Sequence, residues 1–259
     1  MKQVLFSAIL LTLSVLTGYG QKFVYQPGEK VYYTIHYGVI TGGVATLDIK
    51  KEFIDGKEIW HATMDSRTTG MADVLFKVLD IYESFIDPAT ELPVKSIRNA
   101  NEGRYHRYNV NTFDRKTRSD STIVISNLSG KHVAPTGIHD IISCFYFFRN
   151  RHLPELNKYK PGEVISMTTW FTDELYPIRM KYIATEEVKT KMGKIVCHKF
   201  NPVTEVGRLF KTQEDVSFWF SADKNFLPVK IRFDIFVGAF TVDMIGYEGT
   251  VYPLEIKTK

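Results

Sequence analysis

Cysteine is scarce in this chain of 259 residues, and no charge of one sign predominates. The two cysteines, Cys144 and Cys197, are too few for a small domain built on disulfides, and the sequence leaves open whether they pair. The formal net charge is +4, from 33 basic and 29 acidic residues. Such a balance creates no strong field for nucleic acid or anionic lipid, so we predict no nucleic-acid partner.

Motifs for metal binding and catalysis are also missing. The chain has no HExxH or CxxC metal pattern, no GxSxG or SxxK nucleophile motif and no glycine-rich phosphate loop. Its seven histidines are scattered; His132 and His139 would meet only if the intervening loop folded back, and ordinary hydrogen-bonded histidines explain them better. Ser143 and Cys144 lie in an apolar segment, which disfavours a reactive thiolate. We therefore assign no catalytic residue, no metal ligand and no cofactor.

The longest apolar run lies at the amino terminus. Lys2 precedes an uncharged stretch from Val4 to Leu16, and the residues that follow place small side chains at the −3 and −1 positions of a cut between Gly20 and Gln21. A membrane anchor is the alternative, but a spanning helix needs about 20 apolar residues. We predict a signal peptide over 1–20. The mature chain is then exported, periplasmic or otherwise extracytoplasmic, and soluble, without a transmembrane segment.

Alternating apolar and polar residues dominate the rest of the chain. Val31, Tyr33, Ile35 and Tyr37 share one face of a predicted strand, because side chains alternate between the two faces of a sheet. Similar patterns predict strands near 43–53, 57–66, 78–87, 103–113, 120–126, 163–172, 177–188, 194–201, 214–221, 230–237 and 239–248. Strands at this spacing, separated by glycine-containing turns, indicate an antiparallel open barrel or sandwich.

Two segments have helical spacing. Apolar residues between 71 and 79 predict a short helix. A second helix, over about 139–151, begins near Asp140, contains a dense apolar body and is expected to stop at Pro154. A helix that is apolar on nearly every side is normally buried, so this one should plug or cover the sheet.

The chain repeats itself on either side of the second helix. Pro27-Gly28-Glu29 recurs as Pro161-Gly162-Glu163, and Leu92-Pro93-Val94-Lys95 recurs as Leu227-Pro228-Val229-Lys230. The two pairs are 134 and 135 residues apart, so their spacing is preserved. We interpret residues 21–259 as one β-rich domain of two half-units, about 21–130 and 155–259, each covering the apolar face of the other. Two independent domains are the alternative, but no linker separates the halves.

Several of these segments resemble one protein family. The opening from Phe23 to Tyr33, the stretch from Tyr37 to Gly43, the helix from Asp140 to Arg149 and the strand at Leu227–Lys230 are similar to the bacterial "domain of unknown function 3108" family. The resemblance implies an exported β protein with no assigned activity. It also implies an open barrel wrapped on a helix, distantly similar to periplasmic lipoprotein carriers. It supplies no catalytic residues.

Aromatic residues are abundant, at 14% of the chain. Core packing accounts for aromatic residues in any β protein. A large barrel can also enclose an apolar cavity, and the candidates for its lining are Tyr33, Tyr37, Phe85, Trp170, Trp219 and Phe233.

Three functions remain open at this stage. The first is the binding or carriage of a hydrophobic or lipid-like small molecule. The second is an envelope structural or assembly factor that acts through contacts with other envelope proteins. The third is an unrecognised hydrolase, which would need His, Ser or carboxylate side chains to converge in a cleft.

Overall fold

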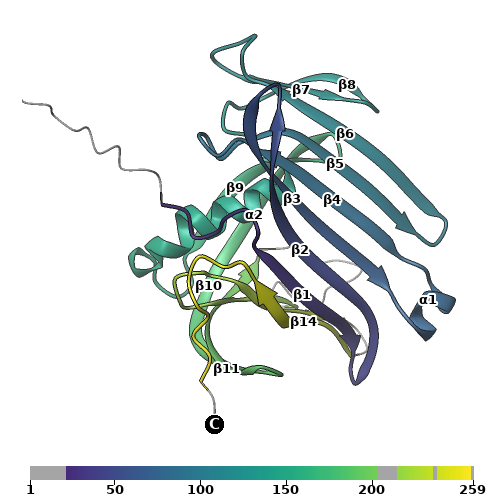
Figure 1. The fold of residues 1–259 in the computed structure, drawn as a ribbon, viewed down its shortest axis with the longest axis vertical. Helices are drawn as coiled ribbons and strands as arrows, with labels where there is room; N and C mark the ends of the chain where they lie inside the picture. The colour runs from purple at the N-terminus through teal and green to yellow at the C-terminus, as the bar shows by residue number, and fades with distance from the viewer. Residues whose placement is uncertain (1–21, 204–214, 236–237, 258–259) are drawn as a thin grey trace, which may run out of the picture.

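One antiparallel sheet of fourteen strands makes up most of the molecule and curls into a nearly closed barrel (Figure 1). This computed structural model describes residues 22–203, 215–235 and 238–257. The strands are β1 (Lys30–Tyr37), β2 (Ile40–Ile54), β3 (Lys57–Thr68), β4 (Leu79–Ile86), β5 (Pro93–Glu102), β6 (Tyr105–Asp114), β7 (Thr122–Ser126), β8 (Gly130–Ala134), β9 (Val164–Phe171), β10 (Glu174–Thr190), β11 (Gly193–Pro202), β12 (Val216–Ser221), β13 (Pro228–Asp234) and β14 (Ala239–Glu248).

Strands that follow each other in sequence mostly lie side by side. The order is β8-β7-β6-β5-β4-β3-β2-β1-β14-β13-β12-β11-β10-β9, so β1 pairs with both β2 and the last strand, β14. The predicted mainly-β antiparallel fold around a buried helix is therefore confirmed.

Two strands were not predicted, β5 and β8. β5 begins at a proline and alternates largely between polar side chains, while β8 has only five residues, so neither shows a clear apolar period. The predicted signal peptide and its cleavage site lie outside the described residues, as do position 214 of one predicted strand and positions 236–237 of another.

The central helix lies inside the curve of the sheet, against β3, β4 and β9 (Figure 1). Helix α2 (Ile141–Phe147) continues as a π-helical turn, η1 (Phe148–His152), and then as a 3-10 helix, η2 (Leu153–Lys158). The expected stop at Pro154 was wrong, because this proline occupies the first turn of η2, where no backbone N–H is needed. The other predicted helix is shorter than expected: α1 covers Met71–Leu75, and β4 begins at Leu79.

A capping box fixes where α2 begins. The Asp140 carboxylate accepts hydrogen bonds from the N–H groups of Ile142 and Ser143, and the Ser143 hydroxyl accepts one from the Asp140 N–H. Ser84 of β4 donates to the other carboxylate oxygen of Asp140 at 2.6 Å. The cap thus ties the start of the helix to the inner face of the sheet.

The two Pro-Gly-Glu segments form the same turn, one before β1 and one before β9. Gly28 and Gly162 have φ angles of 98° and 95°, a region that favours glycine. The Gly28 N–H donates to the Ile49 carbonyl at 2.7 Å, and the Gly162 N–H donates to the Tyr182 carbonyl at 2.8 Å. These matching turns support the interpretation of two half-units, which stays a prediction.

The barrel closes where the edge strands β8 and β9 approach each other. No ladder joins them in the described chain; instead His139, just before α2, forms a parallel bridge with Thr169, and its carbonyl accepts from the Trp170 N–H at 2.7 Å. The Trp170 ring contacts His132 of β8 and packs with Ile138 and other apolar residues. Side chains and the helix entry therefore seal this seam.

A buried ion pair anchors the other end of the helix. Arg149 of η1 donates to both carboxylate oxygens of Glu29, at 2.6 and 3.1 Å, and to the carbonyl of Asn225 at 2.8 Å. Both charged side chains are buried. Burial opposes the charged guanidinium, but attraction to Glu29 outweighs it and raises the pKa of Arg149. One residue on, Asn150 donates to Glu91.

We expect Glu29→Gln to lower the free energy of unfolding by about 3–5 kcal/mol, because it leaves the Arg149 charge buried and unpaired. Equilibrium urea unfolding measures this. Glu163→Gln is the matched control: it changes the same position of the equivalent turn, but Glu163 is exposed, so its curve should overlay the wild type. Equal losses in the two variants would contradict the role given to the ion pair.

A second prediction concerns the seam. Burial, reinforced by the positive charge of Arg115, lowers the pKa of His139 to about 4. The folded state therefore resists protonation of His139, and this contribution to stability is present above pH 6.5 and is lost as the pH falls toward 4. When the pH falls from 6.5 to 4, the unfolding free energy of the wild type should therefore drop by roughly 3 kcal/mol more than that of His139→Gln, which has no imidazole to protonate. Urea unfolding at several pH values tests it; an unchanged pH dependence would contradict it.

Candidate functional site

An apolar groove of about 420 Å³ lies inside the barrel, between the central helix and the inner faces of the surrounding strands. Strands from both halves of the chain line it. Its lining consists of Tyr33, Ile35, Ala45, Thr46, Leu47, Met64, Ser66, Ile141, Ile142, Cys144, Phe145, Phe148, Met167, Ile178, Met180, Phe218, Phe220, Pro228, Ile231, Phe233 and Val242.

Strand alternation explains why this lining is apolar. Tyr33 and Ile35 of β1 lie on one face, and the β14 partner of Ile35 is Val242, which lines the groove as well. Val242 in turn pairs with Ile231 of β13. Residues directly opposite each other on neighbouring strands share a face, so these rows form one apolar wall.

Few polar groups face the groove. The Tyr33 hydroxyl donates to the Pro228 carbonyl at 2.9 Å, so it is already satisfied. Thr46 and Ser66 add two hydroxyls, and none of the described residues that line the groove is charged. The groove can therefore hold an apolar molecule by shape and burial, but it offers little to bind a charged one.

The same rows continue from the groove to the end of the barrel. Phe233 pairs with Phe240, Phe240 pairs with Tyr37, and Tyr37 pairs with Ile40. The rings of Tyr37 and Phe240 lie 5.2 Å apart, and both side chains are exposed. They therefore form an aromatic mouth through which the apolar wall reaches solvent.

The structure brings together two of the six residues predicted to line a cavity. Tyr33 and Phe233 face the groove, whereas Tyr37 lies at its mouth. Phe85 points outward, stacked on His61 at 4.1 Å. Trp219 pairs with Lys199 on the face opposite Phe218 and Phe220, and its indole N–H donates to Glu186 at 2.7 Å.

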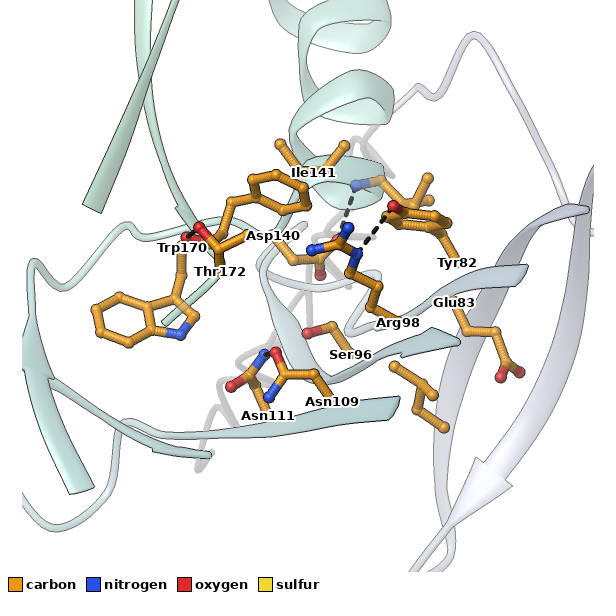
Figure 2. Close-up of a pocket in the computed structure, with 13 residues that line it drawn as sticks. Tyr82, Glu83, Ser96, Arg98, Asn109, Asn111, Asp140, Ile141, Trp170 and Thr172 are labelled. Atoms are coloured by element: carbon orange, nitrogen blue, oxygen red, sulfur yellow. Dashed lines mark hydrogen bonds between the residues drawn. The ribbon is translucent and has the colours of Figure 1, made fainter. Parts of the chain in front are cut away.

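The sixth candidate, Trp170, lines a small polar pocket at the start of α2 (Figure 2). Arg98 crosses this pocket and donates from Nε to the Tyr82 hydroxyl at 2.9 Å, while the amide of Asn111 donates to Asn109 at 3.2 Å. The cavity measures about 30 Å³, which suits water and not an organic ligand. We assign this pocket to the closure of the seam.

A third hollow, of about 550 Å³, lies beside the carboxyl-terminal segment. Strand β11, the β12–β13 turn and the carboxyl-terminal segment each contribute to its lining, which contains both apolar and charged side chains. The lining residues are Ile195, Val196, Ala222, Asp223, Leu254, Glu255, Ile256 and Lys257. It is larger than the groove but lies outside the apolar wall. The groove is the better candidate because its lining is uniform and comes from most of the barrel.

The two cysteines are both free and buried. Cys144 contributes to the groove lining, with its sulfur 3.6 Å from that of Met167. Burial, together with the nearby charge of Asp140, raises the pKa of Cys144 to about 12, so its thiol is protonated at neutral pH and is a poor nucleophile.

One grouping of His, Asp and Ser resembles catalytic chemistry, but its geometry serves the helix cap. His139 Nδ1 lies 3.3 Å from the Ser143 hydroxyl, while the Asp140 carboxylate binds backbone N–H groups and Ser84 and has no bond to His139. All three side chains are buried. No step of acyl transfer can be built on them, since neither a relay nor an accessible nucleophile is present.

The described residues hold neither a metal cluster nor a membrane-spanning helix. Residues 22–203, 215–235 and 238–257 hold no cluster of three or more His, Cys, Asp or Glu side chains placed to bind a metal ion. Within the same ranges, no helix combines the length and the apolar character needed to span a bilayer.

Sequence reasoning missed most of the groove lining. The sulfur side chains of Met64, Met167 and Met180 contribute to it, and they come from three strands that sequence alone does not place together. The alternation of apolar and polar residues along each strand was the available signal, but it does not identify the face that points into the barrel.

Comparison with solved structures supports the architecture. A β-barrel-like protein of domain of unknown function DUF1849 from Brucella abortus is 7% identical in sequence, with a TM-score of 0.53, over 88% of this chain and 98% of that one. Two others align at lower scores: a Bacteroides fragilis protein described as exported with a YmcC-like fold (10% identity, TM-score 0.34, 88% and 98% coverage) and a Parabacteroides distasonis protein described as a lipoprotein (9%, 0.35, 87% and 97%).

No curated protein matches the sequence. A family model does: the protein of unknown function DUF3108, over residues 32–245. That match covers most of the chain, from β1 to β14, and includes the strands and helix that build the groove. The predicted resemblance is thereby confirmed, and the chain belongs to the DUF3108 family.

Proposed function

We propose that this protein binds a hydrophobic, lipid-like small molecule in the apolar groove and carries it in the extracytoplasmic space. The groove itself is the observation that supports this proposal. At about 420 Å³ it falls within the ~300–1,000 Å³ range of small-molecule sites, and the lining residues that the structure describes are all uncharged. Tyr33 and Phe233 are the two sequence-predicted residues that would contact the ligand.

The groove favours an extended chain over a compact polar molecule. Burying each methylene of an acyl chain is worth roughly 0.8 kcal/mol, and a lining of aliphatic, aromatic and methionine side chains adapts to such a chain. The few hydroxyls, of Thr46 and Ser66, supply little directional recognition. The protein should therefore select ligands by length and width, leaving any polar headgroup at the aromatic mouth of Tyr37 and Phe240.

Export is part of the same proposal. The amino-terminal pattern over 1–20 motivates it, and a carrier of apolar molecules has a role wherever they must cross an aqueous compartment. The alternative of an envelope assembly factor would act through surface contacts and has no need of an internal groove. The hydrolase alternative finds no support in the part of the chain that the structure describes, because the buried grouping at the start of α2 has no accessible nucleophile.

Filling the groove should abolish ligand binding. Val242→Trp introduces a large ring into the apolar wall, so we expect the affinity for cis-parinaric acid, a fluorescent fatty acid, to fall at least tenfold. Wild-type protein purified from its own envelope should carry a stoichiometric lipid-like adduct, detected by native mass spectrometry and organic extraction. The Val242→Trp variant purified in the same way should lack this adduct.

Val133→Trp is the matched control, since Val133 is exposed on the edge strand β8, away from the groove. Its affinity should equal that of the wild type. Ala45→Leu, a smaller filling of the same wall, serves if Val242→Trp does not fold. A wild-type protein that carries no adduct and does not bind the probe would refute the proposal.

A further inference from the structure

An exposed apolar rim lies along part of one end of the barrel. We define the rim as Val39 and Ile40 of the β1–β2 hairpin, with Met71, Val74, Leu75 and Phe76 of α1 and its carboxyl-terminal cap. Val39 is 99% exposed, and Met71, Val74 and Leu75 are 72%, 80% and 79% exposed. Helix α1 has no buried residue at all. Large apolar side chains gathered in this way mark a surface that meets an apolar partner.

The backbone of the rim is held in place, so the exposure of these side chains is built into the fold. Thr68 donates from its hydroxyl to the Asp73 carboxylate at 2.9 Å, and the Thr69 N–H donates to the Gly42 carbonyl at 2.9 Å. Gly42 lies so close to α1 that a Cβ there would stand 3.2 Å from the Cβ of Ala72. Similarly, the Gly103 N–H of the β5–β6 turn donates to the Lys77 carbonyl at 2.8 Å.

The rim is continuous with the groove. Phe233 lines the groove and pairs with Phe240, and from there the inner-face row runs through Tyr37 to Ile40 of the rim. On the other side, Ser66 lines the groove two residues before the end of β3, where the connection to α1 begins. An apolar molecule leaving the groove at this end therefore meets the rim before it meets bulk water.

The charges beside the rim are balanced, which suits a zwitterionic surface. Arg67, Lys77 and Arg104 are all exposed, and none of them makes an ion pair within the part of the chain that the structure describes. Two nearby carboxylates are engaged by protein groups: Asp73 accepts from Thr68, and Asp80 accepts from the Asn101 N–H. Hydrogen bonds from neutral groups leave both carboxylates charged, and together with Glu102 they offset the three cations, so docking depends on apolar burial and not on net charge.

We propose that this rim docks on the surface of a lipid bilayer and inserts α1 and the β1–β2 hairpin among the headgroups, so that the groove opens toward the membrane. The occupant is a bilayer because the rim is continuous with the groove proposed to hold a lipid-like molecule, and because its balanced charges match zwitterionic headgroups. Exposed apolar side chains bind at the membrane interface by burial among the headgroups. The proposal rests on the proposed function, since it states where the ligand enters and leaves.

Vesicle co-sedimentation tests the docking. The chain beginning at Gln21 is used, because the apolar run of the leader would itself insert. It should bind phosphatidylcholine vesicles, and added phosphatidylglycerol should change the binding little. Val74→Glu and Leu75→Glu should each weaken binding at least about tenfold, since each replaces an inserted apolar side chain by a charge.

Val133→Glu and Leu128→Glu are the matched controls, because both residues are large, apolar and exposed on the β7–β8 hairpin at the edge of the sheet, with β5 and β6 between that hairpin and β4. They should bind vesicles as the wild type does. Wild-type protein that binds neither vesicle, or rim variants that bind like the wild type, would overturn the docking proposal. The docking proposal would also be overturned if the rim variants lost the binding of an envelope protein and kept wild-type binding to vesicles.

The two proposals fail separately. Val74→Glu and Leu75→Glu leave the groove intact, so they should keep wild-type affinity for cis-parinaric acid in solution. Val242→Trp leaves the rim intact, so it should still bind vesicles while losing the fatty acid. Loss of fatty-acid binding in the rim variants would show that the rim belongs to the groove and not to a membrane-docking surface.

Discussion

The buried ion pair between Glu29 and Arg149 is the contact on which the arrangement of this barrel depends. Two charges without access to water are tolerated only when they satisfy each other, so the position of Arg149 is dictated by the turn before β1 and by the Asn225 carbonyl before β13. Because the guanidinium sits one π-helical turn beyond α2, it fixes how deep and at what angle the helix enters the barrel. The opposite end is fixed by the Asp140 cap.

This placement of the helix creates the groove. With both ends anchored, α2 lies against β3, β4 and β9 and cannot settle onto the whole inner surface of a fourteen-stranded barrel. The space that the helix leaves is bounded by strands whose inward-facing residues are apolar because they face the interior of the barrel. A molecule with an interior this wide must either pack it with protein or leave room for something else. Here the helix fills part of it and the groove accounts for the rest.

Much of the fold was predictable from sequence, because periodicity specifies strands and Asp140 specifies a helix start. The two faces of a strand could not be told apart in the same way. Trp219 and Phe85 are large aromatic residues that face outward, where Lys199, Glu186 and His61 cover them. Register shifts, as between Phe85 and Ile86, also change which residues point inward. The buried ion pair of Glu29 could not be predicted for another reason. The same Pro-Gly-Glu motif recurs at Glu163, and only the three-dimensional position of Arg149 distinguishes the buried carboxylate of Glu29 from the exposed one of Glu163.

The pairing of β1 with β14 has a consequence for the order of folding. Lys30 lies opposite Glu248, so the first strand acquires its second neighbour only when nearly the whole chain is present. Until then one side of β1 keeps unpaired backbone groups, while β2 to β8 can already form a ladder of local hairpins. Contacts of such long sequence separation are slow to form, and an open strand edge invites pairing with other chains. Helix α2 lies between the two groups of strands in sequence and in space, so it offers β9 to β14 a surface to wrap around before the last strand closes on the first.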